Sequence, residues 1–247
     1  MHLSWLNVAR KVEAMANAVA FGATCRREMP ANDYGFQPQR SLALSDAVTL
    51  YLTQDRGLSL AVLERNDISM QRTVVDSSKR TGDSVIVFSY MVAGNVREQK
   101  MRRVSVKKFW QTPGSARCLY GLDNIVGQRE VILLEGEIDM LSCETAGLTN
   151  AASVPGGCGS FTWLDFENTR EILDRSDKIY IATDCDEGGA SAAAHLTEVF
   201  GAHKCFRVQW RCGCKDANEV LCTYGPEALR ADVYAASRPQ SEEPSES

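Results

Sequence analysis

The chain has 247 residues, with 27 Lys plus Arg against 32 Asp plus Glu, so its formal net charge is −5. Hydrophobic residues make up 44% and charged residues 24%, which is ordinary for a globular protein and excludes collagen, coiled-coil and wholly disordered chains. No apolar run reaches the roughly 18 residues of a membrane span. The acidic net charge argues against a protein that coats nucleic acid through its overall charge, but it does not exclude a local basic groove.

The first part of the chain is predicted to be helical. Residues 1–29 have the character of an amphipathic helix, because Glu13 and Glu28 lie within a stretch that a transit peptide would keep nearly free of acids. Prolines, glycine and Asn/Asp residues over 29–39 predict a loop. We therefore predict a helical N-terminal segment over residues 1–68.

Two short helices are predicted near the end of that segment. Residues 44–52 have apolar side chains at helical spacing, and Ser45 stands at the N-cap position. Residues 60–65 form the second helix, which begins after the N-cap Ser59. Gly57 separates the two helices.

A β-hairpin is predicted next. Residues 84–91 are β-branched and aromatic, and residues 96–106 are polar and basic with valines between. The Gly94-Asn95 pair between them is a turn signal, so we expect one buried strand and one solvent-facing strand. This unit forms a basic α/β subdomain over residues 69–126.

Strands and helices alternate from residue 130 onward. The predicted strands are residues 131–134, 151–154, 178–183 and 205–210. The predicted helices are residues 138–146, 163–173, 190–200, 217–224 and 226–236. Such alternation is typical of βαβ units with a largely parallel sheet, so we predict an α/β domain over residues 127–236. A polar tail or linker, predicted to be disordered, follows over 237–247.

The nine cysteines are predicted to be reduced thiols. Their number is odd, no CxxC pair occurs, and Cys212 and Cys214 form the only close pair. A zinc ribbon needs two knuckles with wider spacing, so no zinc is expected.

Acidic side chains follow three of the predicted strands. They are Glu135, Glu137 and Asp139 after the first strand, Asp184 and Asp186 after the third, and Asp216 shortly after the fourth. Ligands of open parallel sheets bind at the carboxyl ends of the strands, so these carboxylates are expected to gather at one edge. Their mutual repulsion calls for cations, and oxygen ligands without His suit Mg²⁺ or Mn²⁺. Such a site is typical of phosphoryl or nucleotidyl transfer.

A structural explanation for the same acids stands beside the catalytic one. A single Asp after a strand is often only a helix cap, and the segment 184–189 alone could be a capped βα turn. Three clusters at three strand ends weaken that explanation.

The second predicted hairpin strand and the residues after it are basic. Six positive residues stand against Glu98: Arg97, Lys100, Arg102, Arg103, Lys107 and Lys108. They could form the solvated face of an edge strand, where Lys guards against aggregation, or a surface that binds nucleotide phosphates or single-stranded template. Phe109 and Trp110 could stack a base, and Lys215 could meet a phosphate.

These residues resemble a known family. Residues 135–139 (EGEID), 184–186 (DCD) and 215–219 (KDANE) look like the signature of a Toprim domain. More narrowly, they resemble the primase half of phage-type primase–helicases and of the organellar Twinkle proteins of plants and protists. Residues 108–111 and 118–122 are similar to that family's segment leading into Toprim. The resemblance extends over roughly residues 45–236.

The resemblance implies a fold and an activity. The fold is a Rossmann-like Toprim domain with a mainly parallel sheet, preceded by a smaller mixed α/β subdomain. The activity is Mg²⁺-dependent or Mn²⁺-dependent synthesis of short RNA primers on single-stranded DNA from ribonucleoside triphosphates.

The resemblance also implies residue roles. Glu135, Asp139, Asp184 and Asp186 would be catalytic. Metal ligands would be Glu135, Asp184, Asp186 and Asp216. Nucleotide and DNA contacts would come from Lys100, Arg102, Arg103, Lys107, Lys108 and Lys215.

The sequence also departs from the family. No zinc ribbon can be built from its cysteines, no Walker motif is present, and Ala190 stands where the family tends to carry a polar or basic residue. One alternative is therefore a catalytically silent Toprim module that binds single-stranded DNA or a replicative helicase. Another Toprim enzyme, such as a nuclease, is the third. The resemblance implies a mitochondrial or plastid location, a possible helicase partner and a monomer without membrane attachment.

Overall fold

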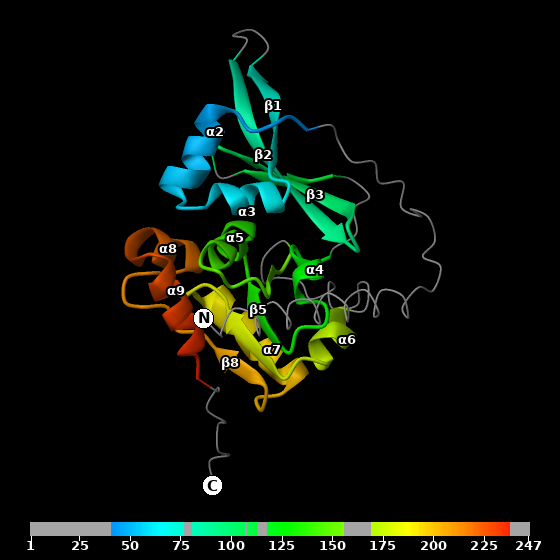
Figure 1. Ribbon diagram of the computed structural model, residues 1–247, viewed down its shortest axis with the longest axis vertical. Coiled ribbons are helices and arrows are strands. Elements are labelled where there is room, and N and C mark those ends of the chain that lie inside the picture. The colour runs from blue at the N-terminus through cyan, green and yellow to red at the C-terminus, as the bar shows by residue number, and fades with distance from the viewer. Residues whose placement is uncertain (1–40, 77–80, 107, 113–117, 156–168, 238–247) are drawn as a thin grey trace, which may run out of the picture.

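The computed structural model describes residues 41–76, 81–106, 108–112, 118–155 and 169–237. Two four-stranded sheets lie one above the other, an antiparallel sheet with order β1-β2-β3-β4 and a parallel sheet with order β6-β5-β7-β8 (Figure 1). The mixed α/β fold class is thereby confirmed. The predictions for the N-terminal helix, the loop over 29–39, Lys107, the tail after residue 237 and the helix residues before 169 lie outside the described residues.

Helices α2 (Asp46–Leu50) and α3 (Leu60–Arg65) lie against the antiparallel sheet (Figure 1). The first continues as a π-helix, η1 (Tyr51–Asp55), so the helix predicted at 44–52 is confirmed and runs three residues further. Ser59 caps α3, since its Oγ accepts a hydrogen bond from the Val62 amide at 3.3 Å. Ser45 holds the N-cap position of α2 without a side-chain hydrogen bond.

The antiparallel sheet consists of β1 (Ser69–Asp76), β2 (Thr81–Val92), β3 (Asn95–Arg103) and β4 (Phe109–Gln111). The predicted hairpin is confirmed, with the turn one residue earlier than expected. Ala93 and Gly94 occupy it, with φ of 50° and 74°. Asp123 fastens this turn, because its two carboxylate oxygens accept from the Ala93 amide at 2.8 Å and the Gly94 amide at 2.9 Å.

The prediction that β3 is a solvent-facing strand is wrong, and so is the edge-strand alternative. β3 lies between β2 and β4, and its four middle residues are buried. Lys100, on one face of the strand, is paired with Glu137 below it, and Met101, on the other face, packs with Val85 and Val87. The charged sequence pattern concealed this burial because the partner of Lys100 comes from a distant part of the chain.

The parallel sheet matches the predicted alternation of strands and helices. Its strands are β5 (Glu130–Leu134), β6 (Ala151–Ser153), β7 (Lys178–Ala182) and β8 (Cys205–Arg207). The described helices that follow β4 are α4 (Leu122–Ile125), α5 (Glu137–Thr145), α6 (Thr169–Asp174), α7 (Glu187–Phe200), α8 (Ala217–Tyr224) and α9 (Pro226–Tyr234). No described helix has the length and apolar character needed to span a membrane.

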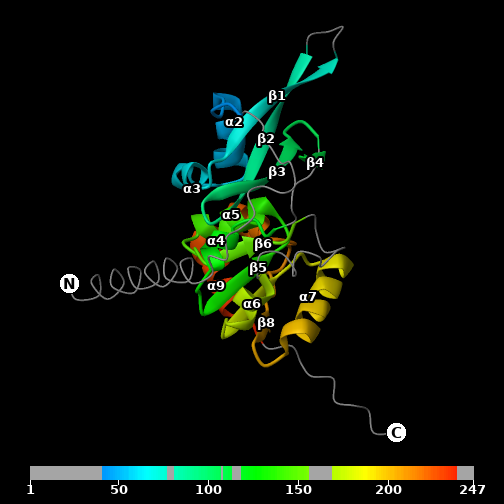
Figure 2. The ribbon, with the colours of Figure 1, turned by 90° about the vertical axis from the view of Figure 1, so that its right-hand side faces the viewer.

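The order of the parallel strands creates a switch point between β5 and β7. The chain leaves β5 through α5 for β6 on one side, and leaves β7 through α7 for β8 on the other. Right-handed crossovers in opposite directions put α5 and α7 on opposite faces of the sheet, as their separation in Figure 2 illustrates. Ligands of open α/β sheets bind in the crevice at such a point.

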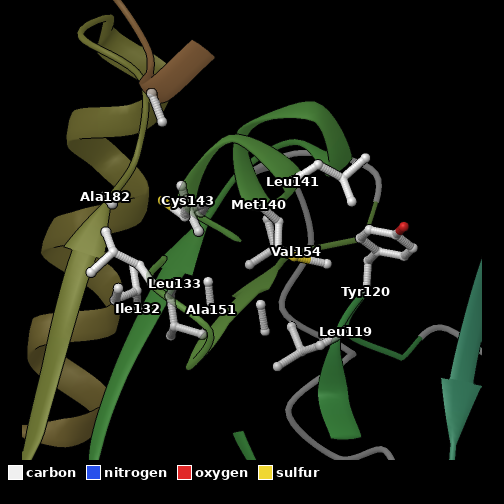
Figure 3. Packing of buried hydrophobic residues seen from close by; sticks show 14 of the residues in the cluster. Leu119, Tyr120, Ile132, Leu133, Met140, Leu141, Cys143, Ala151, Val154 and Ala182 are labelled. Carbon is white, nitrogen blue, oxygen red and sulfur yellow. The ribbon is translucent and has the colours of Figure 1, made fainter. Parts of the chain in front are cut away.

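One hydrophobic core joins the two sheets. Leu133 of β5, Met140 of α5 and Ala151 of β6 pack in the same cluster as Leu119 and Tyr120 (Figure 3). The ring of Tyr120 meets Tyr90 of β2 edge-on, with ring centroids 5.1 Å apart. The predicted domain boundaries at 68/69 and 126/127 stay predictions, but the two sheets share this core.

Candidate active site

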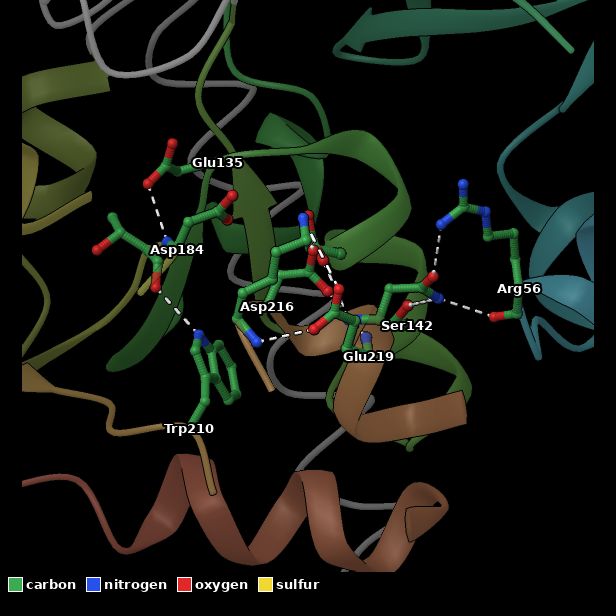
Figure 4. A network of polar contacts seen from close by, with 11 residues as sticks. Arg56, Glu135, Ser142, Asp184, Trp210, Asp216 and Glu219 are labelled. Atoms are coloured by element: carbon green, nitrogen blue, oxygen red, sulfur yellow. Dashed lines mark hydrogen bonds and ion pairs between the residues drawn. The ribbon is translucent and has the colours of Figure 1, made fainter. Parts of the chain in front are cut away.

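Glu135 and Asp184 meet at the switch point. Glu135 directly follows β5, and Asp184 lies two residues beyond β7, so the two neighbouring parallel strands deliver them to the same edge of the sheet. The Glu135 Oε1 accepts a hydrogen bond from the Asp184 amide at 2.9 Å (Figure 4). The structure therefore brings together the two acids that the sequence predicted at these strand ends.

Gly189 allows this close approach. A Cβ at this position would lie 2.1 Å from the Asp184 carbonyl oxygen and 2.8 Å from Glu135 Oε1. Both distances are far below van der Waals contact, so the first turn of α7 can fold against the two acids only with glycine at this position.

The pKa values of two acids are raised by burial and by neighbouring negative charge. Burial raises the pKa of Asp184 to about 6, and the charges of Glu135 and Asp216 add to the shift. Burial and the charges of Asp216 and Asp184 raise the pKa of Asp139 well above its usual value. Both shifts indicate a site whose carboxylates ionise at a cost that a cation would offset.

Asp186 and Asp216 are helix N-caps. Asp186 Oδ1 accepts from the Gly189 amide at 2.7 Å, and Asp216 Oδ1 accepts from the Glu219 amide at 2.8 Å. The other oxygen of Asp216 lies 2.7 Å from Lys215 Nζ, and this hydrogen bond raises the pKa of Lys215. The capping explanation therefore describes part of what these two acids do.

The donor set at this edge consists of carboxylates from three segments of chain, which suits Mg²⁺ or Mn²⁺ by its oxygen chemistry. The crowded negative charge at Asp184 and Asp139 fits the same ions. Within the ranges that the structure describes, no three Asp, Glu, His or Cys side chains converge closely enough to hold a metal ion. Each of Glu135, Asp186 and Asp216 gives one oxygen to a backbone amide in this arrangement.

Asn218 organises the neighbourhood of Asp139. Its amide donates to Asp139 Oδ1 at 3.0 Å, and its side-chain Nδ2 donates to Ser142 Oγ at 2.9 Å and to the Arg56 carbonyl at 2.8 Å (Figure 4). The sequence motif contained Asn218, but reasoning from the sequence gave it no role. Arg56 was missed as well, and only its distant partner in the fold identifies it.

The predicted nucleic-acid contacts are not equally accessible. Lys100 is buried, with its Nζ 2.6 Å from Glu137 Oε1, and the Tyr90 hydroxyl donates to the same oxygen. Arg103 pairs with Asp83 at 3.1 Å. These two cations are thus engaged with protein acids.

Lys108 and Lys215 are exposed, whereas Arg102 is partly buried. The Arg102 guanidinium lies 5.6 Å from the ring centroid of Phe109 and 5.9 Å from that of Tyr51, and burial lowers its pKa. Phe109 is 39% exposed, Lys108 is exposed, and 58% of the Lys215 side chain is exposed. An aromatic ring beside cations is suited to base stacking and phosphate contact.

Comparisons with known proteins agree with this architecture. Residues 132–221 match the family described as Toprim-like. The chain is 35% identical over 204 residues to "Twinkle homolog protein, chloroplastic/mitochondrial" and 34% identical over 203 residues to "Primase homolog protein", both of Arabidopsis thaliana. Each match covers 73% of this chain, but only 27% and 57% of these relatives. The chain therefore spans less than two thirds of either relative.

A solved structure shares the fold. The primase fragment of the bacteriophage T7 primase-helicase protein superposes with a TM-score of 0.62 at 24% identity, covering 78% of this chain and 74% of that one. The chain thus carries a Toprim-like domain and is homologous to the plant Twinkle and primase homolog proteins.

Proposed function

We propose that the chain is the nucleotidyltransferase core of a DNA primase, which joins ribonucleoside triphosphates into short RNA primers on single-stranded DNA. The contact between Glu135 and Asp184 at the switch point carries this proposal. The primase and Twinkle names of the relatives support it.

The acids have distinct tasks in this proposal. Glu135, Asp184, Asp186 and Asp216 hold Mg²⁺ or Mn²⁺, and Asp139 supplies further negative charge beside them. The bound ions supply charge neutralisation on the triphosphate and the leaving pyrophosphate. One oxygen of Glu135 accepts from the Asp184 amide, which fixes the orientation of the carboxylate and leaves the other oxygen to act as a metal ligand or as the general base for the primer 3′-hydroxyl.

In this proposal, residues of β3 and of the segment after it contact the substrates. Arg102 and Lys108 contact template or nucleotide phosphates beside Phe109, on which a base stacks. Lys215, which pairs with Asp216, contacts a phosphate. Lys100 and Arg103 stabilise this strand through their ion pairs with Glu137 and Asp83.

Primer synthesis tests the proposal. The full chain is incubated with single-stranded DNA, labelled ribonucleotides and Mg²⁺ or Mn²⁺. Glu135→Gln should lower the yield of short RNA at least about 100-fold, because the carboxylate is lost. Glu130→Gln is the matched control, since Glu130 lies at the opposite end of β5, where it pairs with Lys178 at 2.8 Å. Equal RNA yield from Glu135→Gln and the wild type would contradict the proposal.

A second candidate is a catalytically silent module that binds single-stranded DNA or a replicative helicase. The capping bonds of Asp186 and Asp216 favour it, because they commit oxygens that metal coordination would use. Single-stranded DNA binding without RNA synthesis, at any Mg²⁺ or Mn²⁺ concentration, would identify this module.

We also propose a mitochondrial or plastid location, on the compartment in the name of one relative. A fluorescent fusion of the full chain tests the location. Sedimentation tests the expected monomer, and co-purification with a replicative helicase tests that partner.

A further inference from the structure

The loop that carries Asp184 is held from the side of β8. The Arg207 guanidinium donates through Nη1 to the Gly189 carbonyl at 2.8 Å and through Nη2 to the Asp184 carbonyl at 3.4 Å. Farther along the chain, Trp210 Nε1 donates to the Thr183 carbonyl at 3.0 Å (Figure 4). The sequence identified this segment only as a strand.

The two hydrogen bonds of the Arg207 guanidinium connect the two ends of the loop. Asp184 opens the loop and Gly189 lies in the first turn of α7, so one planar group spans the segment that contains Asp184 and Asp186. The Gly189 carbonyl also accepts from Thr183 Oγ1 at 2.9 Å. A guanidinium suits this task because its donors are fixed in one plane, whereas a lysine ammonium is a point charge on a flexible stem.

We propose that Arg207 is a positioning residue of the acidic site, which sets the direction of the Asp184 carboxylate by holding the backbone on both sides of the loop. The proposal rests on the proposed function in that the carboxylate is taken to bind a divalent ion. Groups that orient metal ligands without touching the metal commonly change metal affinity 10–100-fold when they are replaced.

The test uses Arg207→Met and Arg207→Lys in the full chain. Mn²⁺ affinity is measured by the electron paramagnetic resonance signal of free Mn²⁺, together with amide exchange at Cys185 and Gly189 without metal. Both variants should bind Mn²⁺ about 10-fold more weakly, and their loop amides should exchange faster. At saturating Mn²⁺ the primer yield should return towards that of the wild type.

Arg230→Met is the matched control. Arg230 also donates to a backbone carbonyl, that of Ala146 at 2.6 Å, but at the C-terminal end of α5. Thermal melts of all variants establish that they fold. A folded Arg207→Met variant with wild-type Mn²⁺ affinity and wild-type loop exchange would overturn the proposal.

Failure of the proposed function gives a different result. If the wild type itself binds no Mn²⁺, the metal-dependent primase proposal fails. The amide exchange of the metal-free loop then decides the role of Arg207, since slow exchange in Arg207→Met overturns it and faster exchange supports it.

Discussion

The Asp184 carboxyl ionises in unfavourable surroundings. Its pKa is raised to about 6 by burial and by Glu135 and Asp216, so the folded state holds its proton at a pH where the unfolded chain has lost it. The stability lost through this group grows as pH rises from about 4 to about 6 and is constant above that range.

Asp184→Asn should therefore stabilise the metal-free protein at pH 8. We expect the free energy of unfolding to rise by about 1 kcal/mol, after a discount for solvent screening of a half-exposed group. This corresponds to a rise in Tm of about 2–4 °C. Thermal melts in a chelator at pH 8 and pH 4 check this, and the gain should shrink at pH 4. Mg²⁺ should raise the Tm of the wild type and leave that of the variant unchanged. A variant less stable than the wild type at pH 8 would show that the shift has another origin.

The hairpin of β2 and β3 depends on α4 for its turn. Asp123→Ala removes both hydrogen bonds to the turn amides of Ala93 and Gly94. Urea unfolding should show a loss of about 1–2 kcal/mol, because both bonds are charge-assisted but exposed. Glu227→Ala is the control, since that side chain is 91% exposed at the start of α9. The idea fails if the two variants unfold at the same urea concentration.

Local sequence predicted most elements of the fold but not all. The alternation after residue 130 was readable because each buried strand ends at a turn and is followed by a helix with its own spacing. Strands β1 and β4 were not foreseen, because Ser69–Asp76 mixes polar and apolar residues and Phe109–Gln111 is only three residues long. Pairing with β2 and β3, rather than their own composition, makes them strands.

The two sheets are joined by a buried ion pair. Glu137 of α5 accepts from Tyr90 and Lys100 of the antiparallel sheet, and the exposed fractions of the Lys100 and Glu137 side chains are 11% and 5%. Glu137→Gln leaves the Lys100 ammonium buried without its charged partner Glu137. We therefore expect the free energy of unfolding to fall by about 3–5 kcal/mol.

A double-mutant cycle checks this prediction. Adding Lys100→Met to Glu137→Gln should restore part of the lost stability, because the stranded charge is removed. Denaturant unfolding measures all four proteins. Strictly additive losses would mean that the pair does not couple the two sheets.

The candidate site was foreseen where acids follow strands, and missed where it depends on packing between distant segments. Glu135 and Asp184 were placed correctly because neighbouring parallel strands end at one edge. Three features each need a partner that is far away in the chain: the burial of Lys100, the hydrogen bond from Asn218 to Asp139, and the hydrogen bonds of Arg207 to the Asp184 loop. No local sequence pattern predicts such partners.

Gly189 makes the arrangement of the two acids depend on a single backbone position. A single added methyl group at this position would collide with the Asp184 carbonyl and with Glu135 Oε1. Both acids would remain in the sequence, yet they would no longer face each other. In a relative that retains every acid but replaces this glycine, the two acids are therefore expected to be separated, and a count of surviving carboxylates would not reveal that change.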